Sequence, residues 1–120
     1  MLYSFSRFGR DAEFAVGLYL KSKDWSVYFS KGSRGPSDIV AIKNGLIWLV
    51  QVKSSLKIPK IKGYEIRKLI ELSNKVNNSF PIVSLIVPKS CSFSKDNSVS
   101  IGDYFLNFYL LPEWKCVTLA

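Results

Sequence analysis

Three polar residues have types and spacing that could perform chemistry together. Asp38 is followed by Gln51 and Lys53, thirteen and fifteen positions later. The carboxylate and the amide oxygen are hard ligands that suit Mg²⁺, and the backbone carbonyl of Val52 offers a third oxygen. Lysine can orient or deprotonate a water molecule, or neutralise a phosphate. With a bound cation to stabilise charge, this is the minimum equipment for phosphodiester hydrolysis.

A predicted β-hairpin would bring these residues together. Asn44-Gly45 separates two apolar runs, 39–43 and 46–53, that are rich in Ile, Val, Leu and Trp. Asn-Gly between such runs is the strongest short-range hairpin signal, because a type I′ turn requires positive φ at both central residues. We therefore expect two adjacent, central antiparallel strands.

The two-residue turn fixes a register in which the numbers of facing residues sum to 89. Val40 then faces Leu49, and Asp38 faces Gln51. Because side chains alternate between faces, Gln51 and Lys53 share the face of Asp38. These residues alone fit two interpretations equally: a site at a sheet edge, or a solvated strand end where Asp38 and Lys53 form a weak surface ion pair. A one-residue bulge would break this register.

The remaining elements predict an α-β-β-β-α-β core. Apolar residues at helical spacing predict a helix over 7–21, with Ser6 as its N-cap and Glu13 at the border of the apolar stripe. Alternation predicts a strand over 25–30. The fold class is α/β: a single domain with a mixed central sheet flanked by helices. The other expected elements are a glycine-rich basic loop (31–37), a basic connector (54–62), a helix (64–77), a strand (81–87), a Ser-rich mobile loop (90–100), and two further segments (104–111 and 115–119) that are strands, or a strand and a short helix.

Composition narrows the function classes. The 120 residues suffice for one domain with its own core, and the net charge of +8 favours a polyanion, either nucleic acid or an anionic membrane surface. The absence of His excludes His-dependent triads and HExxH zinc proteases. Cys91 and Cys116 form no metal-binding pair, and we expect reduced thiols in a cytoplasmic protein. No apolar run is long enough for a membrane span, and no secretory signal is visible.

Four blocks of the sequence resemble the archaeal Holliday junction resolvases of the PD-(D/E)xK nuclease superfamily. Residues 7–13 resemble their RxGxxxE opening, and residues 30–33 resemble their Ser/Gly loop. Ser37-Asp38 followed by Gln51-Val52-Lys53 resembles the nuclease motif itself. The likeness covers about residues 6–88, which gives a nuclease core, a loop over 89–102 and a C-terminal segment over 103–120.

The resemblance implies a restriction-endonuclease-like fold and a homodimer that cuts four-way DNA junctions in symmetric pairs. It implies Mg²⁺ as the cofactor, with Mn²⁺ as a substitute, and neither an organic cofactor nor a membrane partner. The implied metal ligands are Glu13, Asp38, Gln51 and the Val52 carbonyl, and Lys53 is the implied catalytic lysine. Further implied residues are Ser30, or Ser33 as its alternative, in catalysis and Arg7 in DNA contact.

Gln51 departs from the family, which usually has Glu at this position. A neutral amide removes one negative charge, so we expect weaker metal binding. Other nucleases of the superfamily use Gln here, and activity is therefore compatible with the sequence.

Basic residues are concentrated around the candidate site. Between Ile39 and Tyr64 there are five Lys and no acidic residue. Such a patch can contact phosphates without reading bases, which suits recognition of a junction by its shape. Besides Arg7, the expected DNA-binding residues are Arg10, Lys31, Ser33, Arg34, Lys57, Lys60 and Lys62.

Three other functions stay open at this point. The protein could be a PD-(D/E)xK endonuclease for other structured or duplex DNA, a catalytically weakened DNA-binding module, or an RNA-binding protein, although no RNP-like aromatic motif is present. Four aromatic residues near the C-terminus could cover a dimer interface, but packing in the core is the more ordinary role for each. They are Tyr104, Phe105, Phe108 and Tyr109.

Overall fold

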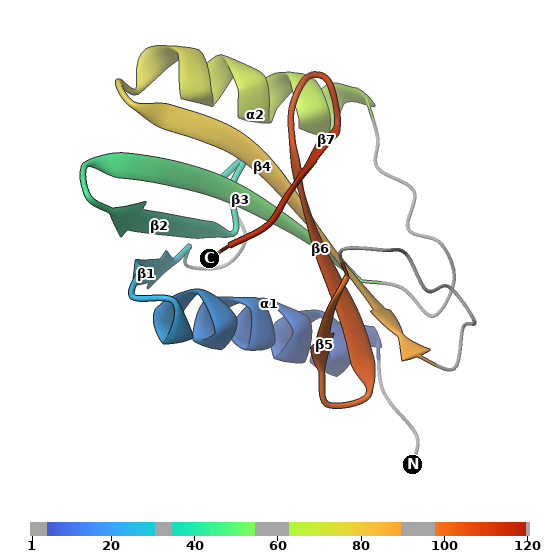
Figure 1. Ribbon diagram of the computed structural model, residues 1–120. Helices are drawn as coiled ribbons and strands as arrows, with labels where there is room; N and C mark the ends of the chain where they lie inside the picture. The colour runs from blue at the N-terminus through green and yellow to red at the C-terminus, as the bar shows by residue number, and fades with distance from the viewer. Residues whose placement is uncertain (1–4, 31–34, 55–62, 90–97, 120) are drawn as a thin grey trace.

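The computed structural model describes residues 5–30, 35–54, 63–89 and 98–119, with side chains from residue 11 onward. Its elements follow the predicted α-β-β-β-α-β order and add strands from the C-terminal segment (Figure 1). The elements are α1 (Phe5–Ser22), β1 (Ser26–Phe29), β2 (Ile39–Lys43), β3 (Leu46–Ser54), α2 (Gly63–Lys75), β4 (Ser79–Pro88), β5 (Val99–Ile101), β6 (Tyr104–Leu110) and β7 (Lys115–Val117).

One mixed sheet forms the centre of the molecule. Its strand order is β1-β2-β3-β4-β6-β5, with β7 paired to β6, and β3 and β4 are parallel whereas the other pairs are antiparallel. The helices α1 and α2 cover opposite faces of this sheet (Figure 1). The predicted α/β fold class with a mixed central sheet is therefore confirmed.

The hairpin β2–β3 forms as predicted. Asn44 and Gly45 both have positive φ, 52° and 81°, which is the conformation of a type I′ turn. Val40 pairs with Leu49, as the expected register requires. Regular pairing ends at Ile39 opposite Val50, and the consequence for the candidate site is described below.

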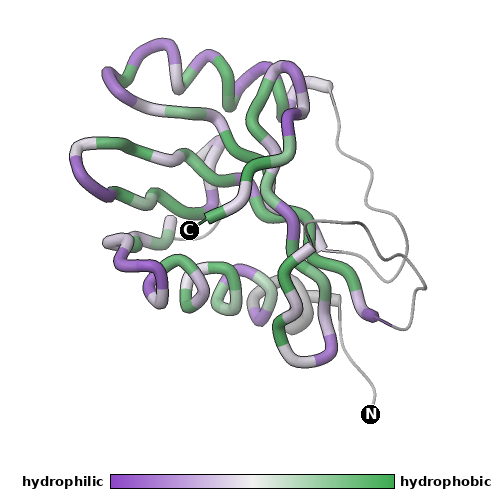
Figure 2. The backbone as a smooth tube through the Cα atoms, in the orientation of Figure 1, coloured by the Kyte–Doolittle hydropathy of each residue, from purple (hydrophilic) through white to green (hydrophobic). Residues whose placement is uncertain are grey.

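Two hydrophobic layers hold the helices against the sheet. On the α1 face, Val16 and Leu20 are fully buried, and Trp48 packs against Trp25 and Phe108 with ring centroids 4.8 Å and 5.6 Å apart. Hydrophobic residues run along the central strands, whereas α2 alternates between hydrophilic and hydrophobic turns (Figure 2). Phe108 is thus a core residue, in agreement with the more ordinary of its two expected roles.

Two details of the predicted elements are wrong. The helix α1 begins at Phe5, so Ser6 lies inside the helix and is not its N-cap. Val99–Ile101, which includes the end of the expected Ser-rich loop, forms β5, a three-residue strand whose partner is β6. Residues 90–97 of that loop lie outside the described residues.

The C-terminal segment resolves the remaining ambiguity. Both expected elements are strands, and β6 extends the sheet by pairing with β4 over seven residues. Cys116 on β7 is a free thiol, whereas Cys91 lies outside the described residues. In the part of the chain that the structure describes, no helix is long and apolar enough to cross a membrane.

Leu69 anchors α2 to the sheet. It is fully buried among Leu49, Val83 and Leu111, and it is the buried residue of this otherwise half-exposed helix. We expect Leu69→Ala to lower the free energy of unfolding by about 2–5 kcal/mol, because truncation leaves a cavity. Urea denaturation measures this change. The matched control is Leu18→Ala on α1, where the side chain is 50% exposed and the expected change is within about 0.5 kcal/mol; equal losses in the two variants would contradict this role of Leu69.

Candidate active site

The candidate site lies where β3 extends beyond its neighbour β2. Because β2 begins at Ile39 opposite Val50, residues 51–54 of β3 pair with β4 on one side and with no described strand on the other. Asp38 occupies this open edge, immediately before β2. Its Oδ2 accepts a hydrogen bond of 2.9 Å from the Val52 backbone N–H, so the side chain satisfies a backbone group that a strand would otherwise bind.

The predicted pairing of Asp38 with Gln51 is wrong, because a bulge interrupts the ladder. Ile39 pairs with Val50, and the Asp38 backbone N–H also donates to the Val50 carbonyl, at 2.8 Å. Two consecutive residues therefore lie opposite one, as in a β-bulge. The bulge redirects the Asp38 side chain toward Val52 along the edge of the sheet.

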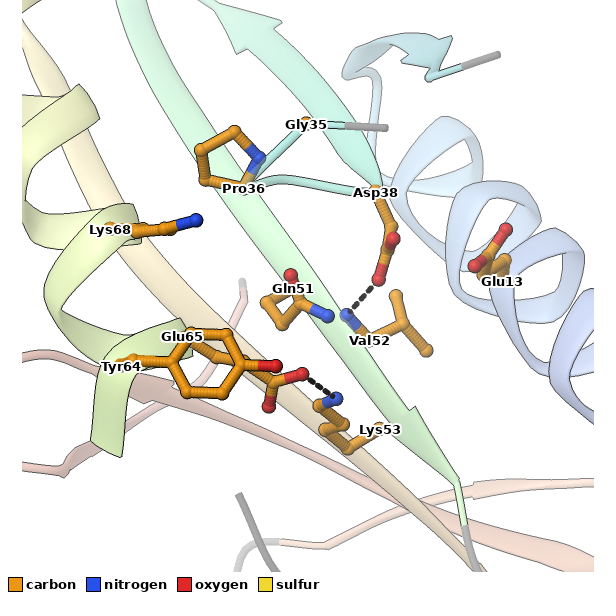
Figure 3. A pocket seen from close by; sticks show the side chains of 10 residues that line it. All are labelled: Glu13, Gly35, Pro36, Asp38, Gln51, Val52, Lys53, Tyr64, Glu65 and Lys68. Atoms are coloured by element: carbon orange, nitrogen blue, oxygen red, sulfur yellow. Dashed lines mark hydrogen bonds and ion pairs between the residues drawn. The ribbon is translucent and has the colours of Figure 1, made fainter. Parts of the chain in front are cut away.

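A cleft of about 480 Å³ opens at this edge, and it gathers residues from four parts of the chain. Figure 3 shows Glu13 on the α1 side of β3, and Tyr64, Glu65 and Lys68 on the α2 side. The predicted metal ligands and the predicted catalytic lysine all line this one cleft. Its lining residues are Glu13, Gly35, Pro36, Asp38, Gln51, Val52, Lys53, Tyr64, Glu65 and Lys68.

The two predicted acidic ligands both bind protons more tightly than usual. Burial raises the pKa of Asp38, and the negative charge of Glu65 adds to this, whereas the hydrogen bond from Val52 and the charge of Lys53 act in the opposite direction. Burial also raises the pKa of Glu13, and the charge of Asp38 adds to it. A site where one carboxylate disfavours the ionised form of another is a suitable setting for a cation.

The donor atoms at the edge fit a hard divalent cation. Asp38 uses Oδ2 for the Val52 N–H, and a carboxylate oxygen has further lone pairs to offer. The N–H and C=O of one residue in an extended strand point to the same side, so the Val52 carbonyl also points to the open edge. No three His, Cys, Asp or Glu side chains of the described residues form a metal-binding group. The candidate ligands are therefore two carboxylates, the Gln51 amide and this carbonyl, as Mg²⁺ accepts alongside water.

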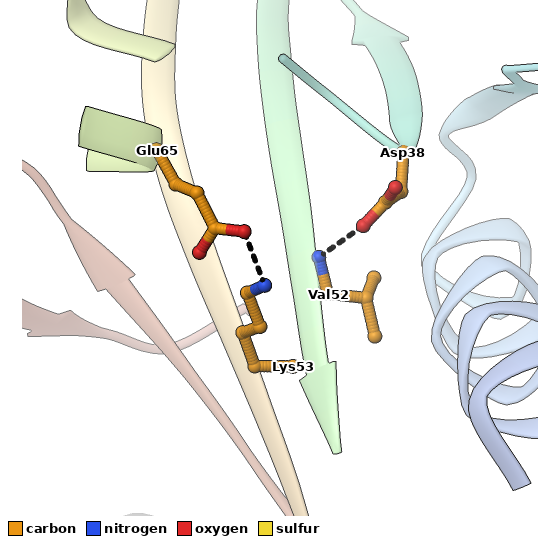
Figure 4. A network of polar contacts seen from close by, with 4 residues as sticks. All are labelled: Asp38, Val52, Lys53 and Glu65. Carbon is orange, nitrogen blue, oxygen red and sulfur yellow. Dashed lines mark hydrogen bonds and ion pairs between the residues drawn. The ribbon is translucent and has the colours of Figure 1, made fainter. Parts of the chain in front are cut away.

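Lys53 reaches across the cleft to α2. Its Nζ donates to Glu65 Oε1 at 2.9 Å, and both side chains are 24% exposed (Figure 4). The alternative expectation of a surface ion pair between Asp38 and Lys53 is wrong. The Asp38 carboxylate accepts from the Val52 backbone N–H, and Lys53 forms its ion pair with Glu65.

Ser30 braces the bulge from the opposite side. Its backbone N–H donates to the Asp38 carbonyl at 2.9 Å, and its hydroxyl donates to the Ser37 carbonyl at 2.7 Å. Ser30 is not among the described residues that line the cleft. Its place in the structure is thus that of a support for Asp38, and its catalytic role stays a prediction.

The expected DNA-binding residues lie largely outside the described part of the chain. Arg7 and Arg10 are in the first turns of α1, where the structure describes only the backbone. Six further residues are outside the described ranges, namely Lys31, Ser33, Arg34, Lys57, Lys60 and Lys62. These predictions stay untested.

Sequence reasoning missed the wall that α2 contributes to the cleft. Tyr64, Glu65 and Lys68 fall in the first two turns of the helix, and Lys68 lies over the Tyr64 ring with its Nζ 5.7 Å from the ring centroid. The spacing of Glu65 and Leu69 was the available signal, since residues at i and i+4 share a face. It could not be used, because the direction in which α2 crosses β3 depends on tertiary packing.

Comparison with known proteins identifies the fold. No family model matches the sequence, and no curated protein matches it. Among solved structures, the chain is similar to Hjc of Archaeoglobus fulgidus, a Holliday junction resolvase from an archaeal hyperthermophile, with a TM-score of 0.59 and 16% identity over 82% of this chain and 81% of that one. The chain has a restriction-endonuclease-like fold.

A second solved structure supports the same fold. The bacterial homing endonuclease I-Ssp6803I matches with a TM-score of 0.53 and 18% identity, over 92% of this chain and 70% of that one. This wider coverage extends beyond residues 6–88, to which the sequence resemblance was limited. The expected fold of the whole chain is thereby confirmed.

Asp38→Asn tests the electrostatics of the site without DNA. The folded-state pKa of Asp38 is above its ordinary value of 3.8, so proton binding stabilises the fold below that pH, and this stabilisation is lost as the pH rises through the folded pKa. Asn imitates the protonated carboxyl and can still accept from Val52. We therefore expect Asp38→Asn to raise the melting temperature in EDTA at neutral pH and to flatten its dependence on pH above 3.8.

The same melts with added Mg²⁺ test the metal ligands. We expect Mg²⁺ to raise the melting temperature of the wild type but not that of Asp38→Asn, because a ligand that binds only the folded state stabilises it. Asp103→Asn, at an exposed turn, is the control and should respond like the wild type. A Mg²⁺ response retained by Asp38→Asn would exclude Asp38 as a ligand.

Proposed function

We propose that this protein is a metal-dependent endonuclease that resolves four-way DNA junctions. One observation carries the proposal. Glu13, Asp38, Gln51, Val52 and Lys53, which come from α1, the loop before β2, and β3, line a single cleft at the open edge of the sheet. They do so in a fold shared with Hjc, a Holliday junction resolvase, and with a homing endonuclease.

In this proposal, Glu13 and Asp38 hold Mg²⁺, or Mn²⁺ in its place, together with the Gln51 amide oxygen and the Val52 carbonyl. When bound, a divalent cation supplies positive charge that stabilises negative charge developing on a phosphate and makes a water molecule more acidic. The Val52 N–H fixes the orientation of the Asp38 carboxylate, with an N···O distance of 2.9 Å. A preoriented ligand of this kind reduces the cost of reorganisation when the site acts.

Lys53 is the candidate for orienting the attacking water or stabilising charge on the phosphate. Lys53 lines the same cleft as the two acidic ligands, and its side chain is only 24% exposed. Its positive charge can orient the attacking water or neutralise a phosphate oxygen. The phosphodiester bond is then broken by water, which leaves a 5′-phosphate and a 3′-hydroxyl end.

We further propose that the active form is a homodimer. A four-way junction has two symmetric strands to cut, and the candidate catalytic residues of one chain all lie in one cleft. Two copies related by a two-fold axis would present two such clefts. Contacts with phosphates, which are insensitive to sequence, suffice for recognition by shape.

The decisive experiment compares a labelled four-way junction with a matched duplex. Wild type and Asp38→Asn are incubated with each DNA in Mg²⁺, and the products are resolved on denaturing gels. We expect symmetric cuts in the junction by the wild type and a loss of at least about a hundredfold in rate for Asp38→Asn, as for removal of a principal electrostatic group.

Each other outcome selects an alternative. Efficient cutting of the duplex would favour an endonuclease for other DNA. Tight binding without cutting would favour a weakened DNA-binding module, which the neutral Gln51 makes a specific rival. If the protein neither binds nor cuts DNA, the proposal is refuted.

Lys68 offers a test of DNA contact within the described residues. It is exposed on α2 and lines the cleft, so its ammonium group is placed to contact a phosphate beside the scissile bond. We expect Lys68→Ala to weaken junction binding and to reduce the slope of log K against log salt by about one unit, since one counterion fewer is released. Lys75→Ala, at the far end of the same helix, is the control and should leave the slope unchanged; equal effects of the two variants would contradict a specific contact.

A further inference from the structure

The ion pair between Lys53 and Glu65 joins the two walls of the cleft. The Lys53 Nζ and Glu65 Oε1 atoms are 2.9 Å apart, and each side chain is 24% exposed. A hydrogen bond between two ionised groups is stronger than a neutral one, and partial burial reduces the screening that weakens surface pairs. The contact therefore fixes where the ammonium group of Lys53 lies.

Strand β3 itself carries no negatively charged side chain that could hold the Lys53 ammonium group in place. Gln51 lies two residues before Lys53 on the same face, roughly 7 Å away along the strand. A carboxylate at position 51 could reach the Lys53 ammonium group, whereas the amide of Gln51 carries no charge. Asp38 accepts the Val52 backbone N–H and lies on the other side of β3 (Figure 4).

Glu65 is held in place by the packing of its own helix. It lies in the first turn of α2, where a carboxylate interacts favourably with the helix dipole. Leu69 follows one turn later on the same face and is fully buried against the sheet. The hydrophobic anchor of α2 thus presents the Glu65 carboxylate to Lys53.

We propose that Glu65 is a positioning residue that orients Lys53, and that it supplies from α2 the negative charge that β3 lacks at Gln51. The role of Lys53 in DNA cleavage is that of the proposed function, on which this inference rests. Glu65 acts through Lys53 and not as a ligand of the cation, in keeping with the finding that no three acidic side chains of the described residues form a metal-binding group.

A purely structural ion pair would behave differently. If the pair served only to dock α2 on the sheet, its loss would lower stability, and a carboxylate at position 51 would not return the Lys53 ammonium group to its original surroundings. If Glu65 orients Lys53, a carboxylate at position 51 can take over, because it lies on the same face within reach of the same ammonium group. Because Gln51 is also a candidate ligand of the cation, kcat of the double variant is compared with that of Gln51→Glu alone, and the Lys53 signal in metal-free samples separates the two roles.

The experiment uses Glu65→Gln, Gln51→Glu and the double variant, with Glu71→Gln as the control. Glu71 is exposed on the same helix and does not line the cleft. Steady-state cleavage of the four-way junction gives kcat and KM. In DNA-free samples, ¹H–¹³C NMR of the Lys53 ε-methylene group reports the surroundings of the ammonium group directly, and thermal melts verify that each variant is folded.

We expect Glu65→Gln to lower kcat about tenfold or more with KM nearly unchanged, and to shift the Lys53 signal. Adding Gln51→Glu should return kcat to within about threefold of the wild type and move the Lys53 signal back. Glu71→Gln should change neither. An unchanged kcat in Glu65→Gln, or a double variant as slow as the single one, would overturn the proposal.

Failure of the proposed function would be recognised separately. If the wild type cuts no DNA, the nuclease proposal fails, and the NMR comparison alone then decides whether Glu65 orients Lys53. A Lys53 signal that does not respond to Glu65→Gln, or that fails to return in the folded double variant, would refute the positioning role in that case.

Discussion

The hydrogen bond from the Val52 N–H to the Asp38 carboxylate is the contact on which the candidate site depends. Strand β3 extends past Val50, the residue opposite the first residue of β2, Ile39. Without Asp38, the Val52 N–H would therefore lack a partner on the β2 side. The carboxylate takes the place of the missing strand and thereby ends the ladder. Burial disfavours the charged carboxylate and therefore raises the pKa of Asp38. In return, the hydrogen bond fixes this carboxylate beside the Val52 backbone carbonyl at the open edge.

The open edge also explains how residues from opposite faces of the sheet can share one cleft. Glu13 belongs to α1 on one face, whereas Gln51 and Lys53 lie on the face covered by α2. Within a continuous sheet these side chains would be separated by the sheet itself. They share one opening only beyond the last paired residue of β2, and the bulge directs the Asp38 side chain into this opening (Figure 3). The length difference between two hairpin strands is therefore a functional feature.

Local sequence signals predicted the hairpin and the order of the core elements, because Asn44-Gly45 and the apolar periodicities act over a few residues. They failed where distant contacts decide. At the bulge, the Asp38 N–H donates to the carbonyl of Val50, the residue that already pairs with Ile39, and no residue type in the sequence predicts this contact. β5 is a strand only because β6 offers it a partner. The contribution of Glu65 required knowledge of how α2 packs, which no periodicity contains.

The charge of the cleft differs in sign from the charge of the chain. The protein carries a net charge of +8, yet the described residues that line the cleft carry three carboxylates, Glu13, Asp38 and Glu65, and two ammonium groups, Lys53 and Lys68. Before any cation binds, these described side chains carry an excess of one negative charge when all are ionised, which favours a dication over a phosphate. With a dication bound, the net charge of this surface becomes positive, and a phosphodiester is then attracted to it. In the proposed nuclease, basic residues elsewhere would therefore bring DNA to the molecule, whereas the cleft would admit the scissile phosphate only once the cation is in place.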